Sequence, residues 1–208
     1  MDVWYVSYGS NLCEDRFMCY IYGDRPPGSA QAEIGCTDKT PPQANGKIEI
    51  PYSLYFSKER SKWGIGGVAF IDHERKHQTN TIGRRYLITG EQFSEVVAQE
   101  NNRSTMYIDL EQVIANGSLS IGSGWYGRVV YLGVMDGAPM FTFTNNDPKK
   151  NMKINKPATA YLSTIARGLL ELGLEREEVV EYFMSKEGIR GFITNEKLKE
   201  YIIEVMKR

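Results

Sequence analysis

The sequence predicts a single α+β domain in which a curved or barrel-like mixed sheet, rich in antiparallel pairs, carries a helical C-terminal region. Three observations favour this class: segments typical of strands dominate up to about residue 145, helical periodicity follows, and neither a repeat nor a low-complexity tract interrupts them. The 208 residues suffice for one good-sized core. We expect a domain over residues 1–185 and a C-terminal helical extension over residues 186–208 that packs on the same domain.

The composition is close to that of an ordinary globular chain. Basic side chains number 25 and acidic ones 26, so no bulk positive field favours nucleic acid or an anionic membrane as a partner. No apolar run approaches the roughly 18 residues of a membrane span, and the N-terminus lacks a secretory pattern. Cys13, Cys19 and Cys36 are odd in number and lack CxxC spacing, which indicates reduced thiols and a cytoplasmic location.

Short runs rich in β-branched and aromatic residues predict the strands. They lie at residues 3–8, 52–57, 64–71, 84–89, 124–134 and 140–144. Residues 23–50 carry many Gly, Pro, Asn and Lys residues and predict a long loop with one strand near 32–35. Residues 73–80 and 145–156 are polar, so we expect an exposed turn and a loop there.

The expected helices lie at residues 12–20, 90–100, 157–172, 175–186 and 195–207, the first of them a short helix or turn. In the helix at 90–100, Glu100 shares one stripe with Phe93, Val96 and Val97, and this spacing places a carboxylate on the apolar face near the C-terminal end. Burial and the negative end of the helix dipole both disfavour a charged carboxylate there. Such a conflict marks a candidate functional residue.

A second candidate site follows the first strand, where the chain reads Tyr8, Gly9, Ser10, Asn11. A strand that ends in small polar residues exposes consecutive backbone N–H groups, which can hold a carboxylate or a developing oxyanion. The same residues could form a tight turn without a ligand. Tyr161, on the helix at 157–172, could likewise wall a pocket or simply pack in the core.

Other kinds of site are disfavoured. The run Gly-Ile-Gly-Gly at 64–67 lacks the following Lys-Ser/Thr of a phosphate-binding loop and opens a strand, so we reject that interpretation. His73 and His77 are spaced like helical metal ligands, but their surroundings are polar throughout, which favours a solvated loop. They are the only histidines and neither has the context of a catalytic triad, so no Ser or Cys nucleophile is proposed.

The order of these pieces resembles the γ-glutamylcyclotransferase family. That family has a Tyr-Gly-Ser-Asn turn after its first strand, as at residues 8–11, and a Trp-Gly-containing strand, matched at 63–70, before its catalytic helix. The last Glu of that helix is matched by Glu100 in Ala-Gln-Glu-Asn, and an aromatic strand follows in the family, as at Met106 and Tyr107. A later helix carries a substrate-contacting Tyr, matched by Tyr161, and runs into a Gly-Leu/acidic turn at 172–175. The resemblance covers roughly residues 3–185.

The resemblance implies the γ-glutamylcyclotransferase-like fold and a cofactor-independent reaction without a metal. In that reaction the α-amine of an L-γ-glutamyl amide attacks its own γ-carbonyl, closes 5-oxoproline and expels an amine. Glu100 would be the general base and acid, in preference to Glu91 and Glu95, which we expect to face solvent. The implied substrate contacts are Tyr5, Val6, Ser7, Tyr8, Gly9, Ser10, Asn11 and Tyr161. The implied partner is a small-molecule γ-glutamyl substrate, with no nucleic acid or membrane, on a monomer or homodimer.

Two departures from the family pattern keep alternatives open. Asn101 stands where the family commonly has Gly directly after the catalytic Glu; because Asn tolerates a left-handed backbone, we expect the turn to survive. The stretch between Asp72 and Gly83 and about the last 20 residues look like additions. The chain could therefore be a non-catalytic binder of a small anion or metabolite, or could pass the γ-glutamyl group to an external amine.

Overall fold

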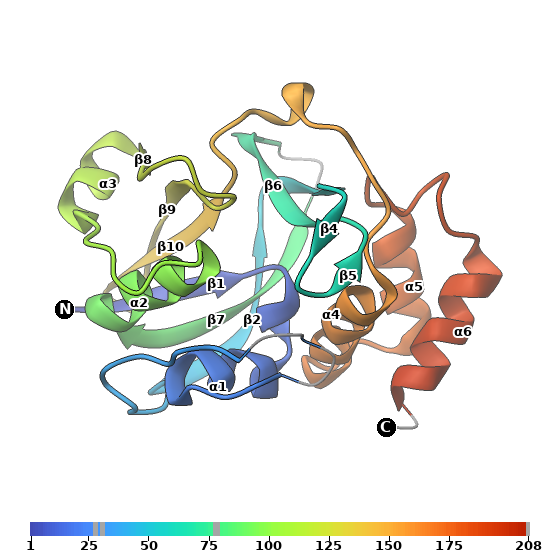
Figure 1. Ribbon diagram of the computed structural model, residues 1–208, viewed down its shortest axis with the longest axis horizontal. Helices are drawn as coiled ribbons and strands as arrows, with labels where there is room; N and C mark the ends of the chain where they lie inside the picture. Colours follow the sequence, from blue (N-terminus) through green and yellow to red (C-terminus); the bar gives the residue numbers. More distant parts are fainter. Residues whose placement is uncertain (27–28, 30–31, 77–79, 207–208) are drawn as a thin grey trace.

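The computed structural model describes residues 1–26, 29, 32–76 and 80–206, and its centre is a six-stranded sheet in the order β2-β7-β1-β10-β9-β8 (Figure 1). β1 runs parallel to β10, and the other neighbouring pairs are antiparallel. The sheet is mixed and curved but open, with β2 and β8 at its edges, which confirms the expected α+β class. The strands are β1 (Asp2–Ser7), β2 (Ala44–Ile50), β7 (Thr81–Thr89), β8 (Ser118–Ser120), β9 (Arg128–Met135) and β10 (Ala138–Thr144).

Two smaller antiparallel pairs lie beside the main sheet. β3 (Tyr52–Ser57) pairs with β6 (Val68–Arg75), and β4 (Arg60–Ser61) pairs with β5 (Gly64–Ile65). Single bridges from Ser57 to Ile154 and from Gly67 to Pro157 join these strands to the segment that leads into α4. The β4–β5 hairpin is thereby held next to the N-terminal end of α4 (Figure 1).

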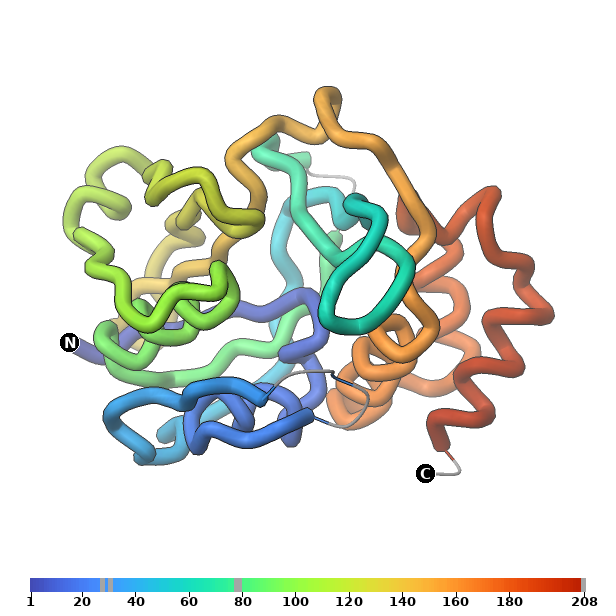
Figure 2. Tube along the Cα trace, in the orientation of Figure 1, coloured from blue at the N-terminus to red at the C-terminus, as the bar shows by residue number. Residues whose placement is uncertain are grey.

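The helices flank the sheet and extend to one side of it. Their bounds are α1 (Glu14–Tyr22), α2 (Gly90–Glu100), α3 (Leu110–Asn116), α4 (Thr159–Glu171), α5 (Arg176–Met184) and α6 (Asn195–Met206), with short 3₁₀ turns at Ser10–Leu12 and Lys149–Asn151. α4, α5 and α6 gather beyond one end of the sheet (Figure 2), and α6 packs on both α4 and α5 through buried Leu198, Ile202 and Val205. None of the described helices has both the length and the apolar character needed to span a bilayer.

An aromatic layer fills the space between the sheet and helices α1 and α2. Tyr5 stacks on Phe143 with ring centroids 5.3 Å apart, and it also contacts Phe93 of α2 at 5.9 Å. Phe17 of α1 stacks on Tyr86 of β7 at 3.9 Å. All five rings are buried. Their packing fixes the end of β1 relative to α1 and α2, which is where the two candidate sites of the sequence lie.

Several sequence predictions for the first half of the chain need correction. Residues 32–35 form no strand, whereas residues 44–50 of the expected loop form β2, which pairs along its length with β7. His73 belongs to the end of β6 and is half-buried, with Nε2 2.7 Å from the carbonyl oxygen of Asn145, so it does not lie in an exposed turn. His77 lies outside the described residues.

Differences in the second half are smaller. The segment at Met106 and Tyr107 is not a strand, and Tyr107 is 89% exposed. Helix α3 follows it and was not predicted. β9 begins at Arg128 rather than at residue 124, because the preceding residues form a turn. Helices α2, α4, α5 and α6 fall within two residues of their predicted bounds at each end.

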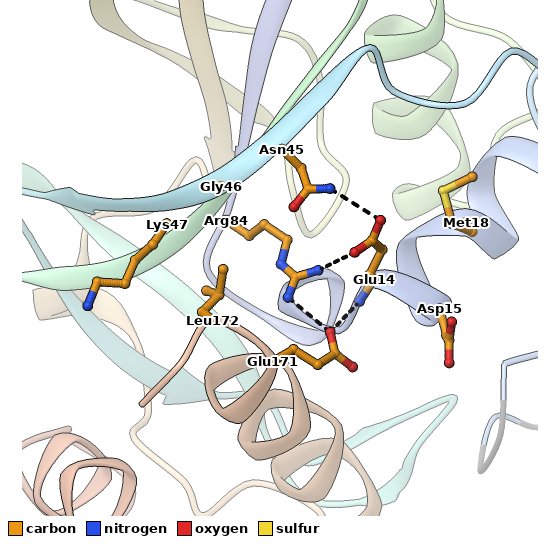
Figure 3. Close-up of a pocket in the computed structure, with 9 residues that line it drawn as sticks. All are labelled: Glu14, Asp15, Met18, Asn45, Gly46, Lys47, Arg84, Glu171 and Leu172. Atoms are coloured by element: carbon orange, nitrogen blue, oxygen red, sulfur yellow. Dashed lines mark hydrogen bonds and ion pairs between the residues drawn. The ribbon is translucent and has the colours of Figure 1, made fainter. Parts of the chain in front are cut away.

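A buried arginine joins three elements: β7, α1 and α4. Arg84 of β7 is 2% exposed, and its guanidinium donates from Nη1 to Glu14 at 2.9 Å and from Nη2 to Glu171 at 3.0 Å (Figure 3). Glu171 also accepts from the backbone N–H of Glu14 at 3.0 Å. These contacts connect the sheet to the start of α1 and to the end of α4. Because the two carboxylates remain partly exposed, part of the cost of burying charge is avoided.

Replacing this arginine tests the connection. Arg84→Ala leaves Glu14 and Glu171 facing each other without a cation, so we expect the free energy of unfolding to fall by about 2 kcal/mol, less than for a fully buried pair because both carboxylates reach solvent. Lys47→Ala is the matched control, since Lys47 pairs with Arg84 across the strands but is exposed. Urea unfolding measures both; equal effects of the two variants would contradict the assignment.

Candidate active site

A small cavity lies where β1 ends, between the C-terminal end of α2 and the N-terminal half of α4. Its volume is about 20 Å³, which is room for about one water molecule. The lining residues come from β1 and the turn after it, from β6, β10, α2 and α4, and from the loop before β9: Tyr5, Ser7, Tyr8, Gly9, Ser10, Asn11, Ala69, Glu100, Tyr126, Phe143 and Tyr161. The structure therefore brings Glu100, the Tyr-Gly-Ser-Asn turn and Tyr161 together.

Glu100 faces this cavity from the last position of α2. Its side chain is half-buried, and Oε1 accepts a hydrogen bond of 3.1 Å from Nδ2 of Asn11. The same Nδ2 donates to the hydroxyl of Tyr5 at 3.1 Å. The amide of Asn11 is 2% exposed, and within the described part of the chain its Oδ1 has no hydrogen-bond partner. The two residues that carry these acceptors, Glu100 and Asn11, thus line one cavity.

The two competing carboxylates lie elsewhere on α2. Glu91 is exposed, and Glu95 is half-buried and accepts hydrogen bonds from the backbone N–H and the hydroxyl of Thr37. Both line a separate groove that also contains Tyr107. Neither therefore reaches the cavity of Glu100.

Asn101 holds the end of α2 through side-chain hydrogen bonds and not through the left-handed backbone that we expected. Its backbone is not left-handed (φ −100°); the following Asn102 has φ +53° instead. The side chain of Asn101 accepts from the backbone N–H of Tyr126 at 3.0 Å and donates to the carbonyl oxygens of Tyr126 and Val97 at 3.1 and 3.0 Å. A glycine could make none of these bonds, so Asn101 couples the Glu100 end of α2 to Tyr126.

The Tyr161 hydroxyl occupies the place where the sequence led us to expect an anion. It accepts from the backbone N–H of Ala69 at 3.2 Å, and the backbone N–H of Ser10 favours its ionised form. Its ring packs against Trp63, with centroids 5.6 Å apart. A Cβ atom added at Gly9 would lie 2.7 Å from the hydroxyl oxygen. A ligand oxygen would have to share these donors with Tyr161 or replace its hydroxyl.

The tyrosines around the cavity keep their protons near neutral pH. Burial raises the pKa of Tyr161 to about 12, and the pKa values of Tyr5, Tyr8 and Tyr126 are also raised, with burial the largest cause in each case. The Glu100 carboxylate contributes in the same direction for Tyr5, Tyr126 and Tyr161. Neutral tyrosine hydroxyls therefore surround one carboxylate, and those of Tyr8 and Tyr126 already donate to the carbonyl oxygens of Phe143 and Ala69.

Val6 differs from its neighbours in the predicted contact set. The cavity lining includes Tyr5 and Ser7 but not Val6, since successive side chains of a strand point to opposite faces. The backbone of Val6 is also occupied, because its carbonyl oxygen accepts from the hydroxyl of Thr142 at 2.7 Å. Tyr5, Ser7, Tyr8, Gly9, Ser10 and Asn11 do line the cavity, and Val6 packs behind it.

Several residues near the cavity were not predicted. Ala69, Tyr126 and Phe143 line it, and burial together with the charge of Glu100 raises the pKa of Tyr20. Only Tyr20 had a local signal: it falls on the buried stripe of α1 with Arg16 and Phe17. The others reach the site through contacts between elements far apart in the chain.

Thiol and metal chemistry find little support at this site. Cys13, Cys19 and Cys36 are free and buried. Burial raises the pKa of the Cys13 thiol to about 11 and that of Cys36 to about 12, which makes both poor nucleophiles near neutral pH. Among residues 1–26, 29, 32–76 and 80–206, no three His, Cys, Asp or Glu side chains cluster as metal ligands would.

Comparison with solved structures identifies the fold. A protein described as a γ-glutamyl cyclotransferase superposes with a TM-score of 0.50 at 15% sequence identity, covering 98% of this chain and 99% of that one. The chain has the γ-glutamylcyclotransferase-like fold. An uncharacterised human protein (TM-score 0.48, 16% identity, 100% and 99% of the two chains) and YkqA from Bacillus subtilis (0.47, 17%, 86% and 52%) are also similar. Identities this low concern the fold alone.

Comparison by sequence finds a different kind of relative. No family model matches the chain. A protein of Arabidopsis thaliana named Histone deacetylase 5 is 36% identical over 202 residues, which covers 89% of this chain and 31% of that protein. The chain thus spans about a third of the length of the curated relative that it matches.

The close approach of Gly9 to Tyr161 gives a test of the cavity geometry. Gly9→Ala places a methyl group against the Tyr161 hydroxyl, so we expect the free energy of unfolding to fall by about 1–3 kcal/mol, as for other overpacked sites. Combining Gly9→Ala with Tyr161→Phe removes the oxygen that clashes, and the double variant should lose less stability than the two single losses added together. Strict additivity in chemical unfolding would show that the two side chains do not meet.

Proposed function

We propose that the protein is a γ-glutamylcyclotransferase-like enzyme that releases 5-oxoproline and an amine from an L-γ-glutamyl amide. One observation carries the proposal: Glu100 and Asn11, whose Oδ1 has no hydrogen-bond partner among the described residues, line the same cavity at the turn after β1. The α-ammonium of a γ-glutamyl group brings three N–H donors, which these two acceptors can receive. The nucleophile lies within the substrate, so the reaction needs no Ser, Cys or metal.

Proton transfer through Glu100 balances the reaction. Glu100 takes one proton from the α-ammonium, and the freed amine attacks the γ-carbonyl carbon to form the ring C–N bond. Glu100 gives that proton to the leaving nitrogen. It then takes a second proton from the ring nitrogen and gives it to the leaving nitrogen too, as the old C–N bond breaks. The ring nitrogen thus gives up two protons and keeps one. The leaving group departs as an ammonium ion, and Glu100 ends as it began.

The rigid surroundings would supply much of the rate enhancement. Holding the amine against its own carbonyl makes the attack intramolecular, and oriented reactions of this kind can gain about 7–11 kcal/mol. The backbone N–H of Ala69, which the Tyr161 hydroxyl receives in this structure, would become a donor for the oxygen on which negative charge develops once that hydroxyl moves. Because the cavity holds about one water as it stands, a lining side chain has to move when a γ-glutamyl group enters.

A non-catalytic binder of a small metabolite is the second candidate, because binding would use the same acceptors without any proton transfer. Transfer of the γ-glutamyl group to an external amine is a third use of the same chemistry. The binder and the transferase have the same expected small-molecule partner and cytoplasmic location as the proposed enzyme. A panel of γ-glutamyl amino acids, γ-glutamyl amines and γ-glutamyl-ε-lysine separates the three; the lysine conjugate is included because the curated relative is named as a histone deacetylase.

The panel has a clear outcome for each candidate. Release of 5-oxoproline from at least one amide supports the proposed reaction. Saturable binding of a panel member with no 5-oxoproline from any of them contradicts it and favours the binder. A new γ-glutamyl product that forms only when a competing amine is added favours the transferase.

Replacing the proposed base is the direct mutational test. Glu100→Gln keeps the shape of the side chain and one oxygen that can accept from Asn11, but it removes the proton acceptor, so we expect 5-oxoproline release to fall at least about 100-fold with little change in melting temperature. Glu95→Gln and Glu91→Gln, on the same helix but outside the cavity, are matched controls and should retain activity. Wild-type rates in Glu100→Gln would remove Glu100 from its role.

A further inference from the structure

The loop before β9, residues 121–127, forms one wall of the cavity through Tyr126. Tyr126 and Glu100 line the same cavity. The Tyr126 ring packs edge-on against Phe143, with centroids 5.3 Å apart, and its hydroxyl donates to the carbonyl oxygen of Ala69 at 3.3 Å. The position of this ring therefore decides how much space the cavity has for a ligand.

Glycines give this loop little stiffness of its own. Gly122, Gly124 and Gly127 are three of its seven residues, and glycine loses more conformational freedom on folding than any other residue. A backbone hydrogen bond of 2.8 Å, from the N–H of Ile121 to the carbonyl oxygen of Gly127, closes the loop at its base. Contacts with other segments have to hold the residues in between.

Asparagine side chains supply such contacts. Nδ2 of Asn145 donates to the carbonyl oxygen of Trp125 at 3.1 Å, and Nδ2 of Asn146 donates to that of Gly122 at 2.8 Å. Both asparagines lie just after β10. A third, Asn101, comes from the end of α2 and bonds the residue that lines the cavity.

Asn101 pairs with both backbone groups of Tyr126. Its Oδ1 accepts from the N–H of Tyr126 at 3.0 Å, and its Nδ2 donates to the carbonyl oxygen of the same residue at 3.1 Å. Nδ2 also donates to the carbonyl oxygen of Val97, one turn back in α2, at 3.0 Å. Since an N–H only donates and a carbonyl oxygen only accepts, exchanging the two ends of the amide would break all three bonds. The side chain thus has one orientation between α2 and the loop.

Gly124 leaves the space that the Asn101 side chain fills. A Cβ atom added at Gly124 would lie 2.6 Å from Cγ of Asn101 and would overlap its Oδ1. Side chains do not approach each other so closely, so the loop backbone and the Asn101 side chain meet without a gap. The loop therefore cannot move toward α2, and the three hydrogen bonds of Asn101 oppose its moving away.

We propose that Asn101 is a positioning residue for the cavity: it clamps Tyr126 to the last turn of α2, so that this wall and the proposed base keep a fixed spacing before a substrate arrives. The assignment rests on the proposed function, in which a γ-glutamyl group enters the cavity. Asn101 is outside the cavity lining, so it acts through Tyr126 and does not touch the substrate.

Steady-state kinetics of Asn101→Gly tests the proposal, with whichever γ-glutamyl amide the wild type turns over. The variant loses all three side-chain bonds, so Tyr126 has to be ordered when the substrate binds, and ordering one side chain weakens binding by about 2- to 10-fold. KM should rise by that factor while kcat stays within about twofold, since Glu100 keeps its bond to Asn11. An unchanged KM overturns the proposal.

Asn102→Gly is the matched control. It makes the same substitution one residue later, where the side chain is exposed and the backbone is already left-handed (φ +53°). Glycine adopts that backbone readily, so KM and the melting temperature should stay at their wild-type values. A rise in KM equal to that of Asn101→Gly would show that any glycine at this end of α2 has the effect, and it would overturn the role of the Asn101 side chain.

Gly124→Ala disturbs the clamp from the loop side and guards against misfolding of α2 in the first variant. The residues of α2 and Asn101 stay as they are, but the new methyl group displaces the Asn101 side chain. KM should rise here too, and Asn101→Gly combined with Gly124→Ala should raise it no further than the larger of the two single changes. Effects that multiply in the double variant would contradict a shared contact.

The Tyr126 side chain separates positioning from plain stabilisation. In Tyr126→Leu the ring is gone, but the backbone groups that Asn101 bonds remain. Adding Asn101→Gly to Tyr126→Leu should lower the melting temperature as it does in the wild type, yet leave KM where Tyr126→Leu alone has it. A further rise in KM contradicts an action through Tyr126.

A readout without turnover separates this proposal from the proposed function. Protein labelled with 3-fluorotyrosine gives ¹⁹F resonances, and Tyr126→Phe identifies the one that belongs to Tyr126. In the ligand-free protein this resonance should shift or broaden in Asn101→Gly and coincide with that of the wild type in Asn102→Gly. A wild type that makes no 5-oxoproline but shows this difference contradicts the enzymatic function alone; a Tyr126 resonance that is identical in the wild type and Asn101→Gly contradicts the clamp.

Discussion

The hydrogen bond between Nδ2 of Asn11 and Oε1 of Glu100 is the contact on which the candidate site depends. It joins the turn after β1 to the last residue of α2, two segments 89 residues apart in the chain. Asn11 is held in turn by Tyr5 and Tyr86, both part of the aromatic layer. Without this bond the Glu100 side chain, which is only half-buried, would be free to turn to solvent. The aromatic core therefore fixes the position of a carboxylate.

Saturated hydrogen bonding gives each polar group near the cavity a single role. The amide nitrogen of Asn11 donates to Glu100 and Tyr5, and its Oδ1 is left as an acceptor without a partner among the described residues. The tyrosines that line the cavity stay protonated because they are buried. An amine-bearing group is the ligand that complements the two acceptors left over.

The sequence predicted correctly the elements whose residues carry a clear helical or strand pattern of their own. Helix α2 agrees with its predicted bounds because its apolar stripe and the Thr89–Gln92 capping box both lie within the segment. Strand β2 was missed because Ala-Asn-Gly-Lys at 44–47 has little strand propensity, and its pairing with β7 imposes the conformation. Resemblance to a family brought together Glu100, the turn and Tyr161, whereas Tyr126 reaches the site only through tertiary contacts.

A crystal structure with bound 5-oxoproline tests the central claim most directly, because the lactam is the product of the proposed ring closure. The account predicts the lactam in the cavity between the turn after β1 and α2, with its ring N–H donating to Glu100 and with Tyr161 displaced from Gly9. Binding at another place, or a Glu100 side chain that points to solvent while the lactam is bound, would contradict it.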